Sequence, residues 1–276
     1  MTPLLRLVRV TNLLIAAGGV LAGGWIALGA IALPRELLLA ALSGIGLGAA
    51  GNVWNDLCDV AGDRLNRPDT SPTHPLAAGL VAPRAARGII VAASAIGLLA
   101  AGLVSVPLLL AGTGALAVML VYSPILKRGP ATGNLAVALI AGMPPFFGAL
   151  AVGVPAAGVV PWTLAAWLHL TREIVKDVED QAGDRALGRR TIPLVVGERP
   201  AEVVAAGVAL LFVPASLLLP RAAGYGGAYY LIALVAQMAV MIAATWLLLG
   251  RIRGVSALLK SAMVVGLGAL VAGKIA

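Results

Sequence analysis

The chain has 276 residues, of which 60% are hydrophobic and only 12% are charged, and its formal net charge is +8. The mean hydropathy is +0.98, and long apolar runs alternate with short polar loops, which excludes an ordinary water-soluble domain. Since backbone polar groups in lipid must be satisfied within the chain, we expect an all-α integral membrane protein. The basic residues follow membrane topology, so nucleic acid is not an expected partner.

Nine apolar segments have about the 20 residues that a helix needs to cross a bilayer. They are residues 11–32, 36–55, 84–103, 106–122, 133–153, 159–177, 201–219, 227–249 and 255–273. The 34 glycines are typical of closely packed membrane helices. We expect a single membrane domain, residues 1–276, in which nine transmembrane helices surround a central apolar cavity.

The charge distribution supports this number of spans. If the amino terminus is cytoplasmic, the inner segments carry 16 of the 20 Lys and Arg. The outer segments carry only Arg35, Arg221 and Lys274, and Lys260 lies within the last span. Positive charge is expected on the cytoplasmic side. The pattern predicts a multi-pass protein of the cell membrane, with the amino terminus and the acidic loops described next in the cytoplasm.

Acidic residues first gather in the stretch NVWNDLCDVAGD, residues 52–63. Asp56, Asp59 and Asp63 are spaced i, i+3 and i+7, so on a helix they share one face. Asn52 lies one helical turn earlier on the same face. This stretch therefore predicts a row of oxygen ligands at the inner end of the second span.

A second stretch, REIVKDVEDQAGD, repeats this arrangement 121 residues later. Asp177, Asp180 and Asp184 have the same spacing, and Glu173 stands where the first stretch has Asn52. Nine of the twelve Asp and Glu lie in residues 56–69 and 173–184. The repetition indicates two carboxylate faces that act together.

Such a concentration of like charge near hydrocarbon is unfavourable unless a cation relieves it. Mg²⁺ prefers hard oxygen ligands and is often bound by a few carboxylates together with substrate phosphates. Two opposed carboxylate faces could hold a diphosphate through metal ions. The alternative is a pair of solvated acidic loop ends, which we disfavour because the spacing occurs twice and cations flank both copies.

Several other polar residues lie near the predicted inner interface. Arg9 and Asn12 precede the first span and serve either as membrane anchors or at the mouth of a site. The proline-rich segment after the first acidic stretch contains Arg67, which either contacts phosphate or is ordinary loop charge. This loop is long enough to fold over a site, and we expect His74 to be a surface residue of it.

The segment VYSPILKRGPATGN contains Tyr122, Lys127, Arg128 and Asn134. Taken alone, the two cations indicate only topology, and the tyrosine is typical of the aromatic belt at a membrane interface. The second acidic stretch also contains like-charge pairs at i, i+4, Arg172 with Lys176 among them, which are unfavourable unless a ligand binds there.

These motifs together resemble those of the UbiA superfamily of intramembrane prenyltransferases. NDLCD followed by Asp63 is similar to the family's NDxxDxxxD motif, and YSPILKR with a following GN resembles its central loop. REIVKDVEDQAGD and RTIPLVVG resemble the pattern of the branch that synthesises digeranylgeranylglyceryl phosphate for archaeal-type ether lipids. The loop NRPDTSPTHPLAAG departs from that branch, with four apparent extra residues and His74 in place of an arginine.

The resemblance implies a Mg²⁺-dependent transfer of a geranylgeranyl group from its diphosphate to the hydroxyl of geranylgeranylglyceryl phosphate. The implied partners are a prenyl diphosphate, a lipid-like phosphorylated acceptor and membrane lipids. The expected metal ligands are Asn55, Asp56, Asp59, Asp63, Asp177, Asp180 and Asp184. The expected catalytic residues are Asp59, Asp63, Lys176 and Asp177. The expected substrate-binding residues are Arg9, Asn12, Asn52, Arg67, Tyr122, Lys127, Arg128, Asn134 and Arg172.

Two other functions remain open from the sequence. An aromatic-acceptor prenyltransferase of the quinone, haem or chlorophyll type would use the same diphosphate chemistry. A cation transporter would also need carboxylates in the membrane, but it would be expected to hold them near the midplane, often between inverted repeats. Here the acidic residues lie at span ends, and the repeated motif has parallel topology.

Overall fold

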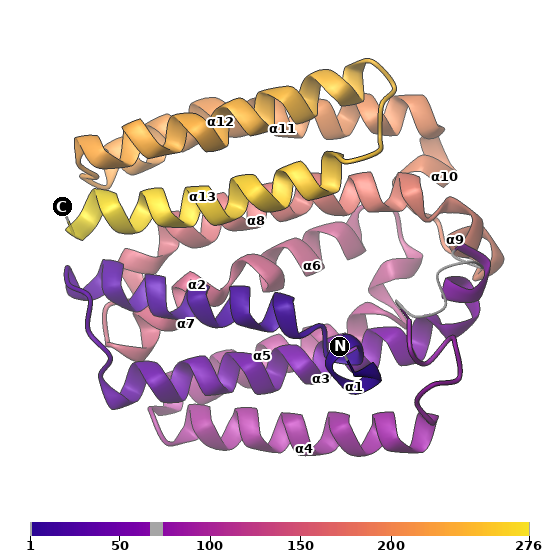
Figure 1. The fold of residues 1–276 in the computed structure, drawn as a ribbon, viewed down its shortest axis with the longest axis horizontal. Helices are drawn as coiled ribbons and strands as arrows, with labels where there is room; N and C mark the ends of the chain where they lie inside the picture. Colours follow the sequence, from indigo (N-terminus) through magenta and orange to yellow (C-terminus); the bar gives the residue numbers. More distant parts are fainter. Residues whose placement is uncertain (1, 67–73, 276) are drawn as a thin grey trace.

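The computed structural model describes residues 2–66 and 74–275, and all regular secondary structure within these ranges is helical (Figure 1). The α-helices are α1 (Pro3–Leu7), α2 (Val10–Leu28), α3 (Arg35–Asn66), α4 (Pro83–Gly102), α5 (Val106–Tyr122), α6 (Thr132–Gly142), α7 (Pro144–Ala151), α8 (Pro155–Glu179), α9 (Gln181–Ala186), α10 (Ile192–Val196), α11 (Glu198–Ala222), α12 (Gly227–Leu248) and α13 (Val255–Ile275). A 3₁₀ turn at Leu126–Arg128 lies between α5 and α6. The all-α fold class is confirmed.

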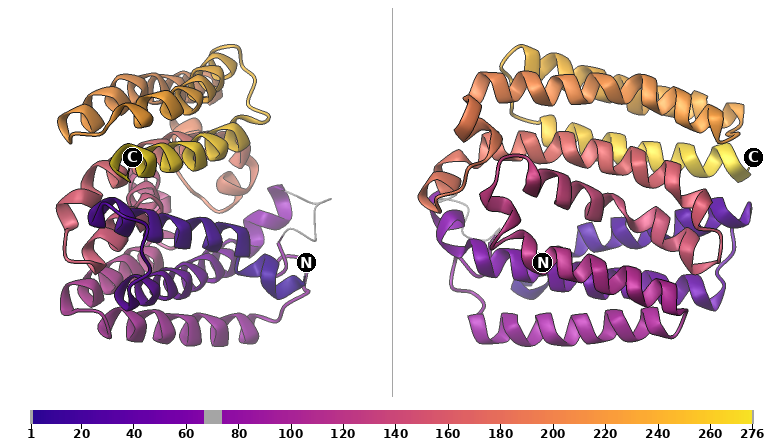
Figure 2. Two further views of the ribbon diagram at one scale, coloured as in Figure 1. Left: turned by 60° about the vertical axis from the view of Figure 1, so that its left-hand side comes forward. Right: turned by 180° about the vertical axis from the view of Figure 1, so that it is seen from behind.

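The long helices run side by side as one bundle, from α4 at one edge to α11 and α12 at the other (Figures 1 and 2). The short helices α9 and α10 gather at one end of the bundle, where the carboxyl ends of α3 and α8 also lie. Helix α8 packs against α6, α7, α11 and α13, so it connects the two halves of the bundle. One end of the structure therefore collects the segments that carry the acidic motifs.

Each of the nine segments in which we expected a span is mostly helical, although helices such as α3 and α8 extend beyond the expected bounds and residues 133–153 contain both α6 and α7. Within the described ranges, six helices are long and apolar enough to cross a membrane. They are α2, α3, α4, α11, α12 and α13. The pair α6 and α7 gives a seventh span if it is counted as one helix with a 42° bend, and the apolar helix α5 is shorter. The number of nine crossings thus remains a prediction.

The outer surface of the bundle is strongly apolar. Leu231 is 76% exposed, Val91 70% and Leu99 69%, and many further leucine and valine side chains are exposed on the long helices. Such a surface is unfavourable in water but suits contact with lipid chains. Together with the long apolar helices, it identifies a multi-pass membrane protein.

Helices α2 and α7 approach each other closely at Gly23. A Cβ atom at this position would overlap the backbone carbonyl group of Pro145. Small residues at helix crossings allow membrane helices to pack backbone against backbone. The break between α6 and α7 occurs at Pro144 and Pro145, because proline cannot continue the backbone hydrogen-bond ladder of a helix. This crossing packs α2 directly against α7.

We predict that Gly23→Ala lowers the midpoint of thermal unfolding in detergent, because overpacking a well-packed contact costs about 1–3 kcal/mol. Gly18→Ala on the same helix is the matched control, since a Cβ atom there meets nothing within 4 Å. The control should be neutral or slightly stabilising, since alanine favours helix by about 1 kcal/mol over glycine. Equal midpoints for the two variants would contradict the close packing at Gly23.

Candidate active site

The first acidic stretch lies on α3, which continues without a break to Asn66, beyond the predicted end of the span. Asp56 is buried, and its Oδ1 accepts a hydrogen bond from Arg9 Nη2 at 2.5 Å. Asn52 Nδ2 donates to the backbone carbonyl of Val8 at 3.0 Å. Arg9 has a φ of 56°, an unusual value for a residue other than glycine. The α1–α2 turn is therefore held against α3 by two of the predicted site residues.

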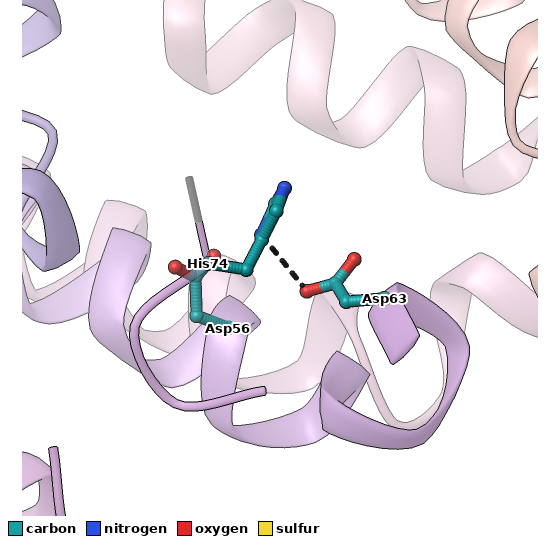
Figure 3. Close-up of side chains that lie close together, drawn as sticks. All are labelled: Asp56, Asp63 and His74. Atoms are coloured by element: carbon teal, nitrogen blue, oxygen red, sulfur yellow. Dashed lines mark ion pairs between the residues drawn. The ribbon is translucent and has the colours of Figure 1, made fainter. Parts of the chain in front are cut away.

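His74 lies next to the first acidic stretch, although we expected it to be a surface residue of the loop. Its Nδ1 is 3.1 Å from Asp63 Oδ2, and only 16% of its side chain is exposed. Single ligand atoms of Asp56, Asp63 and His74 all lie within 4.8 Å of one another (Figure 3). The expectation of a plain surface position is therefore wrong, because the chain that begins at His74 packs against the end of α3.

Asp59 is also buried, and it contacts two cations. Its Oδ2 is 2.9 Å from Lys127 Nζ, and its Oδ1 accepts a hydrogen bond from Arg189 Nη2. The neighbouring Asn55 accepts a hydrogen bond from Ser123 Oγ at 3.0 Å. The central loop between α5 and α6 is thus bound to the first acidic stretch at two points.

The second acidic stretch does not lie on one continuous helix. Helix α8 ends at Glu179, Asp180 forms the junction, and Asp184 belongs to the short helix α9. The expectation that the three aspartates share one helix face, as they do in the first stretch, is wrong. The break turns Asp184 towards Arg189, whose Nη1 donates to Asp184 Oδ1 at 2.8 Å.

Arg189 joins the two acidic stretches. Its guanidinium group donates to Asp59 on α3 and to Asp184 on α9. The side chains of Arg189 and Asp184 are only 7% and 2% exposed. Burial by itself lowers the pKa of Arg189, but the charges and hydrogen bonds of Asp59 and Asp184 raise it overall, so the residue stays charged. The predicted meeting of the two stretches is therefore seen directly in this bridge.

From the sequence, Arg189 counted only among the basic residues of the inner segments. The available signal was its place between the second acidic stretch and the RTIPLVVG segment. Helix α3 is closely packed in this region at Gly62, where a Cβ atom would lie 2.8 Å from Leu187 Cδ1 and the leucine side chain would have to shift.

The remaining residues of the second stretch lie on α8. Asp177 is buried, and its Oδ2 accepts a hydrogen bond from Asn134 Nδ2 at 2.7 Å. Glu173 is contacted by Arg172 at 3.1 Å and by Lys176 at 3.2 Å. Tyr122 lies within electrostatic range of Asp59, Glu173 and Asp177. Five of the predicted residues thus surround the same region as Asp59.

The other predicted site residues do not all lie in the region around Asp59. Asn12 Oδ1 accepts a hydrogen bond from Lys260 Nζ at 3.0 Å, on the side of the site formed by α2 and α13. Arg128 is exposed, and its backbone carbonyl accepts a hydrogen bond from Arg190 N at 3.2 Å. Asp180 is half-buried at the α8–α9 junction. Arg67 lies outside the described residues.

The donors present fit a hard divalent cation. Most of the clustered side chains offer carboxylate or amide oxygens, the ligands that Mg²⁺ prefers. Asp184 Oδ2 is buried and has no hydrogen-bond partner among the residues that the structure describes. A buried carboxylate oxygen without a donor is unfavourable and can be satisfied by a bound cation.

Comparison with known proteins places this arrangement in a family, since residues 16–263 match the UbiA prenyltransferase family. The chain belongs to this family. It is therefore an enzyme of the prenyltransferase class, which excludes the alternative of a cation transporter. Over 274 residues it is 36% identical to the digeranylgeranylglyceryl phosphate synthase of Natronomonas pharaonis, with 99% of this chain and 97% of that protein covered.

Solved structures of UbiA proteins share the fold. One, of a digeranylgeranylglyceryl phosphate synthase, superposes with a TM-score of 0.77 at 25% identity, covering 99% of this chain and 98% of that one. A UbiA homologue from Archaeoglobus fulgidus bound to GPP and Mg²⁺ gives a TM-score of 0.62 at 19% identity, covering 98% and 99%. The helical arrangement described above is thus that of the UbiA family.

In this UbiA-family chain we predict that Arg189→Met lowers stability by about 3–5 kcal/mol, because it leaves two buried carboxylates without their shared cation. The midpoint of thermal unfolding should be measured in detergent with a chelator present. Arg190→Met is the matched control, because Arg190 is adjacent and exposed. A similar midpoint for the two variants would show that the bridge contributes nothing.

Proposed function

We propose that the chain catalyses the Mg²⁺-dependent transfer of a geranylgeranyl group from its diphosphate to the free hydroxyl of geranylgeranylglyceryl phosphate. The observation that carries the proposal is the meeting of two acidic stretches around Arg189 at one end of the bundle. The similarity to the Natronomonas pharaonis synthase over nearly the whole chain supports the acceptor. The Archaeoglobus fulgidus homologue with GPP and Mg²⁺ supports the donor and the metal.

Ionisation of the allylic carbon–oxygen bond leaves a diphosphate whose negative charge must be stabilised. Bound magnesium supplies that positive charge. The proposed ligands are Asn55, Asp56, Asp59 and Asp63 on α3, and Asp177, Asp180 and Asp184 across the site. We assign the fixed positive charge for the diphosphate to Lys127 and Arg128 in the turn between α5 and α6 and, from the sequence alone, to Arg67.

The allylic cation must be shielded from water until the acceptor hydroxyl attacks it. The apolar side chains of the long helices form such a shield around the proposed central apolar cavity. An open apolar groove with a volume of about 490 Å³ lies between α2 and α13, lined by Trp25, Leu267 and Val271 among others. We propose that an isoprenoid chain from the bilayer lies along this groove, since its lining is almost entirely hydrocarbon.

We also propose a single domain with nine membrane crossings, in which α5, α8 and the bent pair α6–α7 each count as one. In this arrangement the protein lies in the cell membrane, and the end of the bundle that holds the site faces the cytoplasm. The reason is that the Lys and Arg of the chain are concentrated at that end. The phosphorylated head groups of the substrates reach the site from that side.

We predict that Asp59→Ala and Asp177→Ala each reduce the rate of product formation with Mg²⁺ by at least about a hundredfold, because charge stabilisation in the transition state is lost. The assay measures transfer of a radiolabelled prenyl group by purified protein. Glu36→Ala is the control, since Glu36 is exposed at the opposite end of the same helix as Asp59. Near-wild-type rates for both aspartate variants would defeat the assignment.

The acceptor is tested by offering the wild-type protein one radiolabelled prenyl diphosphate with either a glycerol ether phosphate lipid or a set of aromatic acceptors. We predict product only with the phosphorylated lipid, and none with either acceptor when magnesium is removed by a chelator. Product with an aromatic acceptor alone would replace our proposal with the aromatic-acceptor alternative.

A further inference from the structure

A lysine near the start of the last helix lies beside the site, although no motif includes it. Lys260 on α13 reaches Asn12 on α2, and the distance from its Nζ to Asn12 Oδ1 is 3.0 Å. The two residues are 248 positions apart in the sequence. Ionisable residues within membrane helices are costly and mostly occur where function requires them.

The surroundings of Lys260 are positively charged. Arg172, Arg9 and Lys176 all lie within electrostatic range of its ammonium group. Arg9 is already paired with Asp56, and Glu173 is shared by Arg172 and Lys176. Among the described residues, the hydrogen-bond partner of Lys260 is a neutral amide. The side of the site formed by α8 and α13 therefore carries excess positive charge.

The charges match a particular ligand. Arg172, Lys176 and Lys260 exceed the single carboxylate of Glu173 by two positive charges. A phosphate monoester carries about −1.5 to −2 charges at neutral pH and offers three strong acceptor oxygens. In addition, Arg172 Nε is buried and has no hydrogen-bond partner in the described part of the chain. An anion with several acceptor oxygens would satisfy this donor and the ammonium groups together.

We propose that Lys260, with Arg172 and Lys176, binds the phosphate monoester of the acceptor lipid. This inference rests on the proposed function and adds a second anion subsite to it. The subsite lies on the α13 side of Glu173, whereas the carboxylates proposed to hold the diphosphate lie around Asp59 and Arg189. A phosphate fixed on one side presents the free hydroxyl of the glycerol towards the allylic carbon on the other, which lowers the entropy cost of the encounter.

The test is steady-state kinetics of the full-length Lys260→Met variant with Mg²⁺, in which each substrate is varied in turn. We expect KM for the phosphorylated acceptor to rise by about tenfold to a hundredfold, as for the loss of a charge-assisted hydrogen bond. KM for the prenyl diphosphate should change by less than about twofold, and Lys260→Arg should retain most of the acceptor affinity. An unchanged acceptor KM, or a rise only in KM for the prenyl diphosphate, would overturn the proposal.

Lys274→Met is the matched control, because Lys274 is a lysine at the opposite end of the same helix. It donates to the carbonyl of Ala223 at 2.7 Å, away from the site. We expect the control to keep the acceptor KM of the wild type. An equal rise in acceptor KM for the two variants would assign the effect to a general loss of packing and overturn the proposal.

A binding measurement without turnover separates this inference from the proposed function. A glycerol ether phosphate lipid and its dephosphorylated alcohol are titrated into chelator-treated protein. The wild type should bind the phosphate form more tightly, by about tenfold or more, and Lys260→Met should lose the difference. Equal binding of the phosphorylated lipid and its alcohol would overturn the subsite. If the preference is found but wild-type protein forms no product from this acceptor, the proposed function fails while the anion subsite stands.

Discussion

The structure depends on how carboxylates are accommodated at the end of an apolar bundle. Asp59 and Asp184 are buried, and the guanidinium of Arg189 lies between them. Isolated buried carboxylates would be strongly unfavourable, whereas charge-assisted hydrogen bonds from one planar cation can serve both. This bridge brings together two segments more than a hundred residues apart, and with them the carboxylates that we propose as metal ligands.

Charge around the site is divided into two regions. Carboxylates predominate near α3 and α9, where Lys127 and Arg189 contact Asp59. Cations predominate near α8 and α13, where Lys260 has a neutral partner. A reaction between an anionic donor held through metal ions and an acceptor with its own phosphate needs both regions. The division therefore agrees with two phosphorylated substrates that bind on opposite sides of the same site.

Interruptions of regular helix position much of this chemistry. The left-handed backbone at Arg9 turns α1 against α3, and its side chain then pairs with Asp56. The break at Asp180 separates α8 from α9 and directs Asp184 towards Arg189. Unusual backbone conformations often occur at functional sites because the surrounding contacts hold them in place. The regular helices form the membrane-embedded bundle, and the interruptions orient the charged side chains of the proposed site.

The sequence by itself determined the membrane class, the approximate helices and both acidic stretches, because hydropathy and residue spacing are local properties. Its motifs also predicted a site that contains Lys127, Asn134 and Asp177, and whether these residues act in it stays a prediction. Only the tertiary structure decided that Arg189 joins the stretches, that His74 folds over Asp63 and that Lys260 reaches Asn12. These contacts join residues on separate elements, most of them far apart in the sequence. Their geometry follows from how the helices pack and where they break, which periodicity along the chain does not encode.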